Sequence, residues 1–314
     1  MTALDTLTTH IPVMVDEVKT ALAVQPGGRY LDCTVDGGGH AAAILEAAAP
    51  GGSLLGIDAD PEALAIARER LAQYASSVVL VEGNFRDAEA ICRERGYVPV
   101  NGVLFDLGLS SLQLAKPERG FSFRSEGPLD MRFGPGQGPS AWSLVNETSD
   151  QELADLIWRY GEERQSRRIA GAIVRRRPID TTLELAKAVE QAVGRGPPGS
   201  IHPATRTFQA LRIAVNQELT TLSEALPRVH GLLGFGARLV VISYHSLEDR
   251  IVKQYIGRES RDCVCPPGQP VCTCGHKATL RPVTRGVVKP SLAEVAANPR
   301  ARSARLRAAE RLAA

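Results

Sequence analysis

Long hydrophobic runs are missing from this sequence. Nowhere do roughly 18 apolar residues follow one another, which is the length that a membrane-spanning helix needs. The first ten positions are polar and rich in threonine, without the basic region and apolar stretch of a signal peptide. We therefore expect a cytosolic protein.

Net charge is nearly absent as well. Lys and Arg total 37 and Asp and Glu total 35, so the overall charge identifies no partner. Any surface for nucleic acid has to be a local patch, for which the arginine run at 175–177 is one candidate. No internal repeat is visible, and a hydrophobic share of 44% is enough to build buried cores.

Strands and helices alternate in the first third of the chain. The pattern predicts strands at 29–34, 53–58, 78–82 and 102–107, with helices at 41–49, 62–73 and 87–95 between them. These strands are apolar along their whole length, which is typical of a parallel sheet covered on both faces. The fold class predicted from the sequence is therefore α/β, with a doubly wound sheet.

The alternation breaks after residue 107. A Gly- and Pro-rich stretch at 116–140 leads into helices with no strands between them, which favours an inserted helical domain. A helix is expected at 204–225, with one apolar stripe facing a core. The α/β pattern then resumes with a strand at 238–243, and residues 305–308 alternate as a half-buried edge strand would.

A glycine loop, 36–40, follows the first predicted strand, where open α/β sheets bind ligands. Asp58 ends the next strand at the distance typical of acids that bind ribose hydroxyls. Asp32 and Asp36 flank the loop and would repel a pyrophosphate, and the full G-x-G-x-x-G spacing is absent. The loop therefore favours cationic S-adenosylmethionine over a nicotinamide cofactor, although three glycines can also be only a tight turn.

The residues carry a resemblance to a known family. The matching segments are HIPVMVDE at 10–17, DGGGH at 36–40, DLGLSSLQ at 106–113, ERGFSF at 118–123, GPLDMR at 127–132, HPATRTFQALRIAVNQEL at 202–219, SYHSLEDRIVK at 243–253 and NPRARSARLRAAER at 298–311. In these segments the sequence resembles the RsmH family, also called MraW, of bacterial methyltransferases that act on small-subunit ribosomal RNA. Many relatives differ from it at 261–280.

The resemblance implies methylation of N4 of a cytidine in the decoding region of 16S ribosomal RNA, with S-adenosylmethionine as the donor. It implies a class I methyltransferase domain at 1–112 and 208–314 and a helical substrate domain at 113–207. The implied partner is 16S ribosomal RNA within the small ribosomal subunit, and a homodimer is left open. The implied cofactor contacts are Gly38, Gly39, His40, Asp58, Phe85, Asp106 and Gln113.

Three residues are candidates for handling the amine. Asp106 could accept a hydrogen bond from it or contact the methionine ammonium group, and the resemblance favours the second role. His245 is a candidate proton acceptor, with a structural hydrogen bond at a strand end as the alternative. Tyr244 could stack on the flipped base or merely pack. An RNA methyltransferase, a nicotinamide-dependent oxidoreductase and a non-catalytic RNA-binding assembly factor remain the competing classes.

Cations and aromatic rings interleave in the segment after residue 118, where arginines could pair with phosphates and rings could stack on bases. The alternative is that these arginines lie on a solvated surface and that the rings pack inside the protein. The candidate RNA-binding residues are Arg119, Phe121, Phe123, Arg124, Arg132 and Arg212.

Two C-x-C pairs stand close together near the end of the chain: Cys263 with Cys265, and Cys272 with Cys274. Four thiolates in a cytosolic chain suggest structural zinc, although C-x-C spacing is less usual than the C-x₂-C knuckle. The alternative is a loop that holds free thiols.

Overall fold

The computed structural model describes residues 11–134, 138–197, 199, 201–269 and 271–313. His10, the first residue of one segment that carries the resemblance, lies outside this set. The chain forms two compact units, one made of Met1–Gly108 with Leu219–Ala314 and the other of Leu109–Glu218. The predicted boundary near residue 208 therefore falls inside the second unit.

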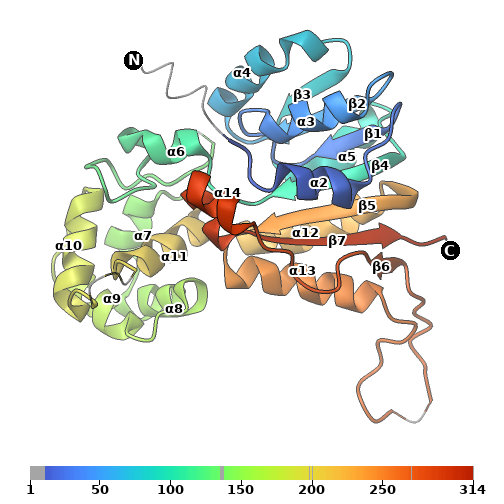
Figure 1. Ribbon diagram of the computed structural model, residues 1–314. Coiled ribbons are helices and arrows are strands. Elements are labelled where there is room, and N and C mark those ends of the chain that lie inside the picture. The colour runs from blue at the N-terminus through green and yellow to red at the C-terminus, as the bar shows by residue number, and fades with distance from the viewer. Residues whose placement is uncertain (1–10, 135–137, 198, 200, 270, 314) are drawn as a thin grey trace. The chain divides into compact units, whose positions relative to one another are not determined.

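A seven-stranded sheet is the centre of the first unit, in the order β3-β2-β1-β4-β5-β7-β6 (Figure 1). The strands that pair in parallel are β1 (Arg29–Asp32), β2 (Ser53–Asp58), β3 (Val78–Glu82), β4 (Val100–Asp106) and β5 (Leu233–Ser243). Two antiparallel strands follow, β7 (Arg305–Arg311) and β6 (Leu280–Pro282). The predicted doubly wound α/β fold of the class I methyltransferases is confirmed.

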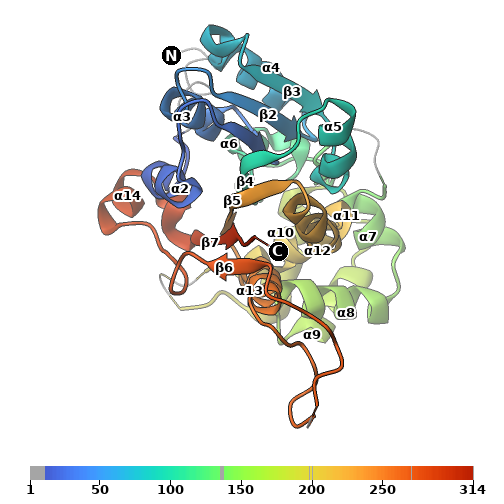
Figure 2. The same ribbon diagram turned by 90° about the vertical axis from the view of Figure 1, so that its right-hand side faces the viewer.

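Helices cover both faces of this sheet. They are α2 (Val15–Leu22), α3 (Gly39–Ala47), α4 (Pro61–Arg70), α5 (Ala88–Glu94), α12 (Glu218–His230), α13 (Ser246–Glu259) and α14 (Leu292–Ala297). Successive strand residues point to opposite faces, so Leu239 and Val241 join the core under α5, α12 and α13, while Val240 and Ile242 join the core under α2 and α3. Figure 2 shows α2 and α3 on one side of the strands and α5 and α12 on the other.

The alternating residues near the end of the chain do not form an edge strand. β7 pairs with β5 on one side and with β6 on the other, and Leu306 and Ala308 are buried. The prediction of an edge was wrong, because the three-residue strand β6 carries almost no pattern of its own and yet takes the edge position.

The second unit is helical and has its own core. Its helices are α6 (Ser111–Ala115), α7 (Ala141–Glu147), α8 (Asp150–Gly161), α9 (Ser166–Val174), α10 (Thr182–Val193) and α11 (Ala204–Asn216). Ser149 with Glu152, and Thr181 with Glu184, form capping boxes that start α8 and α10. Leu153, Ile157 and Leu211 are fully buried in this core.

The single helix expected at 204–225 is two helices. Gln217 has a positive φ of 50°, which ends α11 before α12 begins. Phe208 and Leu211 are buried in the helical unit, while Leu222 is buried in the core beside the sheet. One apolar stripe therefore serves two separate cores, so the sequence period alone did not reveal the break. Within the described part of the chain, no helix has the length and apolar character needed to cross a membrane.

Candidate active site

Asp58 ties the end of β2 to the glycine loop. One carboxylate oxygen, Oδ2, accepts a hydrogen bond from the backbone N–H of Asp36 at 2.7 Å, and Oδ1 accepts one from Asp60 at 2.9 Å. Asp58 therefore holds the loop that follows β1 in place. Each oxygen keeps a further lone pair, so the same carboxylate can also accept bonds from ligand hydroxyls.

The glycines of the loop have packing reasons of their own. Gly38 has a positive φ of 77°, and a Cβ there would lie 3.3 Å from the Cα of Ala67. A Cβ on Gly39 would lie 3.0 Å from the ring of Pro12. Close packing is thus sufficient to require both glycines, and their contact with a cofactor stays a prediction.

His40, Asp106 and Tyr244 lie together at the carboxyl ends of β4 and β5. The Nε2 of His40, a residue only 6% exposed, is 3.4 Å from Asp106 Oδ2. Burial lowers the pKa of His40, but Asp106 more than offsets this and raises it above its usual value. Burial, together with the charge and hydrogen bonding of Asp106, raises the pKa of the Tyr244 phenol well above its usual value. These side chains therefore form one electrostatically coupled group.

His245 is built into the start of α13. Its Nδ1 accepts a hydrogen bond from the N–H of Glu248 at 3.4 Å, while Glu248 Oε2 accepts bonds from the N–H groups of Tyr244 at 2.9 Å and His245 at 3.3 Å. The other ring nitrogen, Nε2, lies 3.1 Å from Glu248 Oε1. His245 is thus the N-cap of α13, which is a structural role. The role of His245 as a proton acceptor stays a prediction.

Replacing His245 should separate these two roles. We expect His245→Ala to lower the free energy of unfolding by about 1–2 kcal/mol, since the cap is lost. His245→Asn keeps an acceptor for the helix and should recover most of that stability. If the Asn variant is stable but transfers methyl groups much more slowly in a single turnover, His245 acts in the chemistry; an unchanged rate removes it from the mechanism.

Two other implied cofactor contacts have structural partners. Phe85 follows β3 and packs edge-on against Phe105, with 5.4 Å between ring centroids, and it stays partly exposed. Gln113 belongs to the helical unit, where its Oε1 accepts a bond from the N–H of Ser110 at 3.2 Å and completes a capping box. Their contact with adenine or methionine stays a prediction.

The candidate RNA-binding segment after residue 118 makes many contacts within the helical unit. Phe121 is only 7% exposed and stacks on Phe133, so base stacking would require it to leave the core. Arg119 donates to the carbonyl of Phe133 at 2.8 Å. Phe123 packs against His202, with 4.7 Å between ring centroids.

The candidate arginines differ in how strongly they are engaged. Arg132 makes a two-pronged ion pair with Asp130, at 2.9 and 2.6 Å. Arg212 does the same with Glu218, at 2.8 and 2.9 Å. Arg124 is exposed. A phosphate contact is therefore easiest to assign to Arg124, because Arg132 and Arg212 already have carboxylate partners.

Two further site residues, Thr34 and Glu248, were not among the candidates from the sequence. The hydroxyl of Thr34 accepts a hydrogen bond from the N–H of Asp106 at 2.6 Å and so joins β1 to β4 beyond their ladder. Glu248 positions Tyr244 and His245 as described above. The spacing of Glu248 three residues after an N-cap was a usable signal, whereas Thr34 had none. The four cysteines, Cys263, Cys265, Cys272 and Cys274, lie together in a separate loop.

Comparison with known proteins agrees with this geometry. The model of the MraW methylase family matches residues 7–312. The chain belongs to this family. Proteins named Ribosomal RNA small subunit methyltransferase H are 59% identical in Dehalococcoides mccartyi, over 96% of this chain and 86% of theirs, and 55% identical in Thermomicrobium roseum, over 98% and 94%. A relative of the same name in Syntrophotalea carbinolica is 52% identical, over 96% and 98%.

S-adenosylmethionine, the donor of class I methyltransferases, fits the charges at this edge of the sheet. Among the described residues, Asp32 Oδ2 and Asp106 Oδ1 are buried without a hydrogen-bond partner. An unpartnered buried carboxylate is costly, and a cationic ligand would satisfy it. Burial raises the pKa of Asp32 to about 6 and that of Asp58 to about 7. In this MraW family member, Asp32 Oδ2 and Asp106 Oδ1 are therefore the atoms that the ammonium group of the ligand would contact.

Cofactor binding should depend on pH through these two acids. A ligand that needs them ionised displaces the protons they hold in the free protein, so binding should tighten as pH rises through 6 to 7. We expect the Kd for S-adenosylmethionine to increase by about tenfold or more between about pH 7.5 and about pH 5.5. Titration calorimetry in two buffers of different ionisation enthalpy should detect proton release, and a flat Kd with no proton release would contradict the assignment.

Proposed function

We propose that this protein transfers a methyl group from S-adenosylmethionine to N4 of a cytidine in the decoding region of 16S ribosomal RNA, within the small ribosomal subunit. Relatives at 52–59% identity carry the name of a small-subunit ribosomal RNA methyltransferase. The atom and the region rest on the family resemblance. The single observation that supports the donor is that two buried carboxylate oxygens, Asp32 Oδ2 and Asp106 Oδ1, have no hydrogen-bond partner among the described residues. A cytosolic location is part of this proposal.

In such a reaction, the residues of the chain hold the cofactor, orient the amine and accept its proton. S-adenosylmethionine, when bound, supplies an electrophilic methyl group on a sulfonium sulfur. The N4 amine is a weak nucleophile because its lone pair is delocalised into the ring, so the site has to orient it and accept one proton from it. We assign Asp58 to hold the ribose, and Asp32 and Asp106 to hold the ammonium group.

Tyr244 and His245 are the groups we place near the target base. Tyr244 is anchored by its backbone N–H to Glu248, and its ring faces Asp106. A phenol whose pKa is raised stays neutral at physiological pH, so it can pack on a base or donate a hydrogen bond but not accept the amine proton. The remaining candidate acceptors are His245 and solvent.

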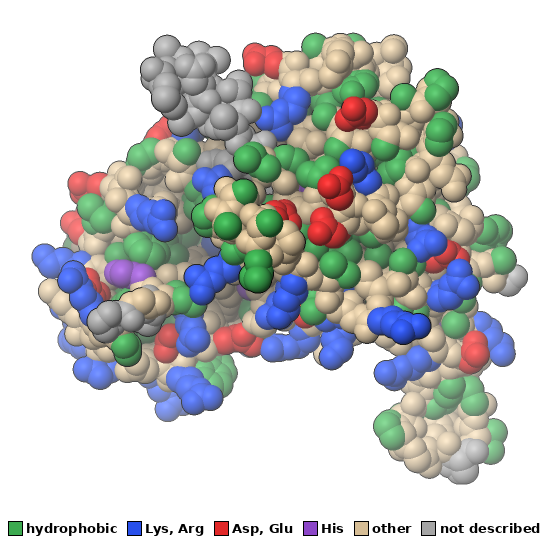
Figure 3. All heavy atoms as spheres, in the orientation of Figure 1, with side chains coloured by type: hydrophobic (Ala, Val, Ile, Leu, Met, Phe, Trp, Pro, Cys, Tyr) green, Lys and Arg blue, Asp and Glu red, His purple; other side chains and the backbone are tan. Residues whose placement is uncertain are grey.

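The helical unit is the proposed substrate-recognition domain. Exposed arginines lie on and beside α9, and Figure 3 shows Lys and Arg side chains gathered over this unit. The exposed ones are Arg164, Arg167, Arg168, Arg175 and Arg176. Arg176 also donates to the carbonyl of Ala188 at 3.2 Å. Arg177 is only partly exposed, and its guanidinium donates to the carbonyls of Val145 and Thr148 and so holds α7. The exposed arginines supply a phosphate-binding surface without base contacts.

Methyl transfer to the proposed substrate tests this directly. Small ribosomal subunits from a strain without this gene would be incubated with the protein and labelled S-adenosylmethionine, and the nucleosides resolved by mass spectrometry. We expect label in N4-methylcytidine or its 2′-O-methylated form. Label in another nucleoside would keep the enzyme class and overturn the proposed target atom. If the protein binds the cofactor but transfers no label to subunits or to naked RNA, both the proposed target atom and ribosomal RNA as the substrate are overturned.

A further inference from the structure

The loop between α13 and β6, residues 260–279, has no core of its own. It extends away from the strands (Figure 1), and no described side chain between 261 and 279 is buried. A loop of this length without apolar burial needs another source of order. Four free cysteines lie in it, Cys263, Cys265, Cys272 and Cys274, and none of them belongs to the candidate active site.

The sulfur atoms are spaced as ligands of one tetrahedral ion. All four lie within 4.8 Å of one another. The Sγ of Cys265 is 4.0 Å from that of Cys272, and the Sγ of Cys274 is 3.6 Å from Cys272 and 3.9 Å from Cys263. With a Zn–S bond of about 2.3 Å, tetrahedral geometry places neighbouring sulfurs about 3.8 Å apart. A disulfide would need about 2.05 Å, so these separations match a shared ion instead.

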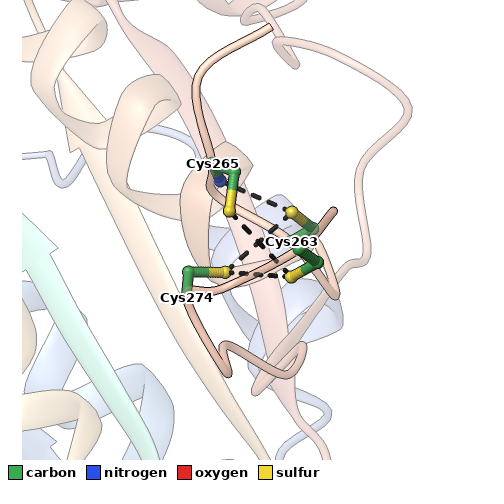
Figure 4. Close-up of side chains that lie close together, drawn as sticks. Cys263, Cys265 and Cys274 are labelled. Carbon is green, nitrogen blue, oxygen red and sulfur yellow. Dashed lines mark hydrogen bonds between the residues drawn. The ribbon is translucent and has the colours of Figure 1, made fainter. Parts of the chain in front are cut away.

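Backbone groups also point at the sulfurs. The N–H of Val264 and that of His276 donate to Cys274 Sγ, at 3.4 and 3.5 Å, and the N–H of Cys265 donates to Cys263 Sγ at 3.4 Å. Such bonds stabilise thiolates and are the outer contacts that orient metal ligands. Figure 4 shows the labelled side chains directed toward a common centre.

We propose that Cys263, Cys265, Cys272 and Cys274 bind one structural zinc ion. Four thiolates complete a tetrahedral site and leave no open position for a reacting water, which separates this centre from the methyl-transfer chemistry. Four thiolates around Zn²⁺ leave two negative charges. His276 is not among the side chains whose ligand atoms lie within 4.8 Å of one another, and its Nε2 lies 3.2 Å from the carbonyl of Arg258.

Metal analysis of the whole chain tests the proposal without any activity assay. The protein would be made without a His tag in zinc-supplemented medium, dialysed, and measured by mass spectrometry for metal and protein. We expect about one zinc per chain. Cobalt(II) exchange should give the intense sulfur-to-metal absorption and the visible bands of a tetrahedral thiolate site. Cys272→Ser with Cys274→Ser should lower bound zinc by about tenfold or more.

Two variants serve as matched controls. His276→Ala should keep the zinc, which distinguishes four sulfurs from three sulfurs and an imidazole. Cys92→Ala removes a cysteine buried beside the sheet and should also keep it. Metal-free protein with four thiols that react readily in the native state would overturn the proposal, as would a disulfide found by mass spectrometry. Neither result bears on methyl transfer, which is tested separately.

Discussion

Replacing Asp58 with asparagine should raise the Kd for S-adenosylmethionine by about 100-fold, while the protein stays folded. The Asp58 carboxylate accepts the N–H groups of Asp36 and Asp60, one on each oxygen. Asparagine keeps only one acceptor, so one of these backbone groups loses its partner and the glycine loop loses its tie to β2. Bonds from ribose hydroxyls to a charged acceptor are lost at the same time.

Two ligands and one surface variant make this prediction specific. 5′-Methylthioadenosine has the ribose but lacks the ammonium and carboxylate groups, so Asp58→Asn should weaken it by the same factor as S-adenosylmethionine. Asp16→Asn makes the same chemical change on a side chain that is 90% exposed on α2, and it should leave both Kd values within about twofold. Calorimetry would measure both. Weakening of S-adenosylmethionine alone would place the ribose elsewhere.

The sheet could be predicted from the sequence because two signals agree for each parallel strand. They are the apolar residues of the strand and the helices on either side of it in the chain. Strands such as 53–58 and 78–82 are apolar throughout and lie between helices of the expected length, and β2 and β3 have those bounds. In β2 the two-residue alternation places Leu54 in one core and Leu55 and Ile57 in the other. In β3, which is at the edge of the sheet, Val79 is 40% exposed, so the expected cover on both faces is incomplete there.

Features that depend on several distant segments could not be predicted in the same way. The break at Gln217 depends on a left-handed backbone that the side chain does not demand, and the helices on either side of it fill different cores. The edge position of β6 depends on β7 being paired on both sides. Local pattern specifies which face of an element is apolar but not which core will receive it.

In the candidate site, too, residues marked by a local pattern could be predicted and contacts that depend on the fold could not. Asp58 and the loop at 36–40 were visible because a strand end, a glycine loop and a spacing of about 20 residues coincide. The partners of Arg132 and Arg212 were not, because a carboxylate only two or six residues away looks like any other surface charge until the geometry is known. Interleaved arginine and phenylalanine indicated RNA contact, and the structure adds ion pairs for Arg132 and Arg212 and core packing for Phe121, so their contact with RNA stays a prediction.

Replacing Asp106 with asparagine should weaken S-adenosylmethionine selectively. The Oδ1 atom of Asp106 is buried and, among the described residues, unpartnered, while Oδ2 lies 3.4 Å from His40. Asparagine has nearly the same shape but no charge, so the methionine ammonium would lose a charge-assisted bond. We expect the Kd for S-adenosylmethionine to rise by about 30-fold to about 100-fold and the Kd for 5′-methylthioadenosine to change by less than about threefold.

The ligand pair separates the two roles considered for Asp106. A residue that binds the ammonium group changes the affinity of the ligand that has this group and spares the ligand that lacks it, whereas Asp58→Asn is expected to weaken both ligands equally. A residue that orients the amine of the base changes neither affinity, and instead slows single-turnover methyl transfer at saturating cofactor. Unchanged Kd values with a slower transfer step would therefore contradict the cofactor role and move Asp106 to the substrate side of the site. Thermal unfolding of the variant, compared with that of Asp16→Asn, would show whether the fold is kept.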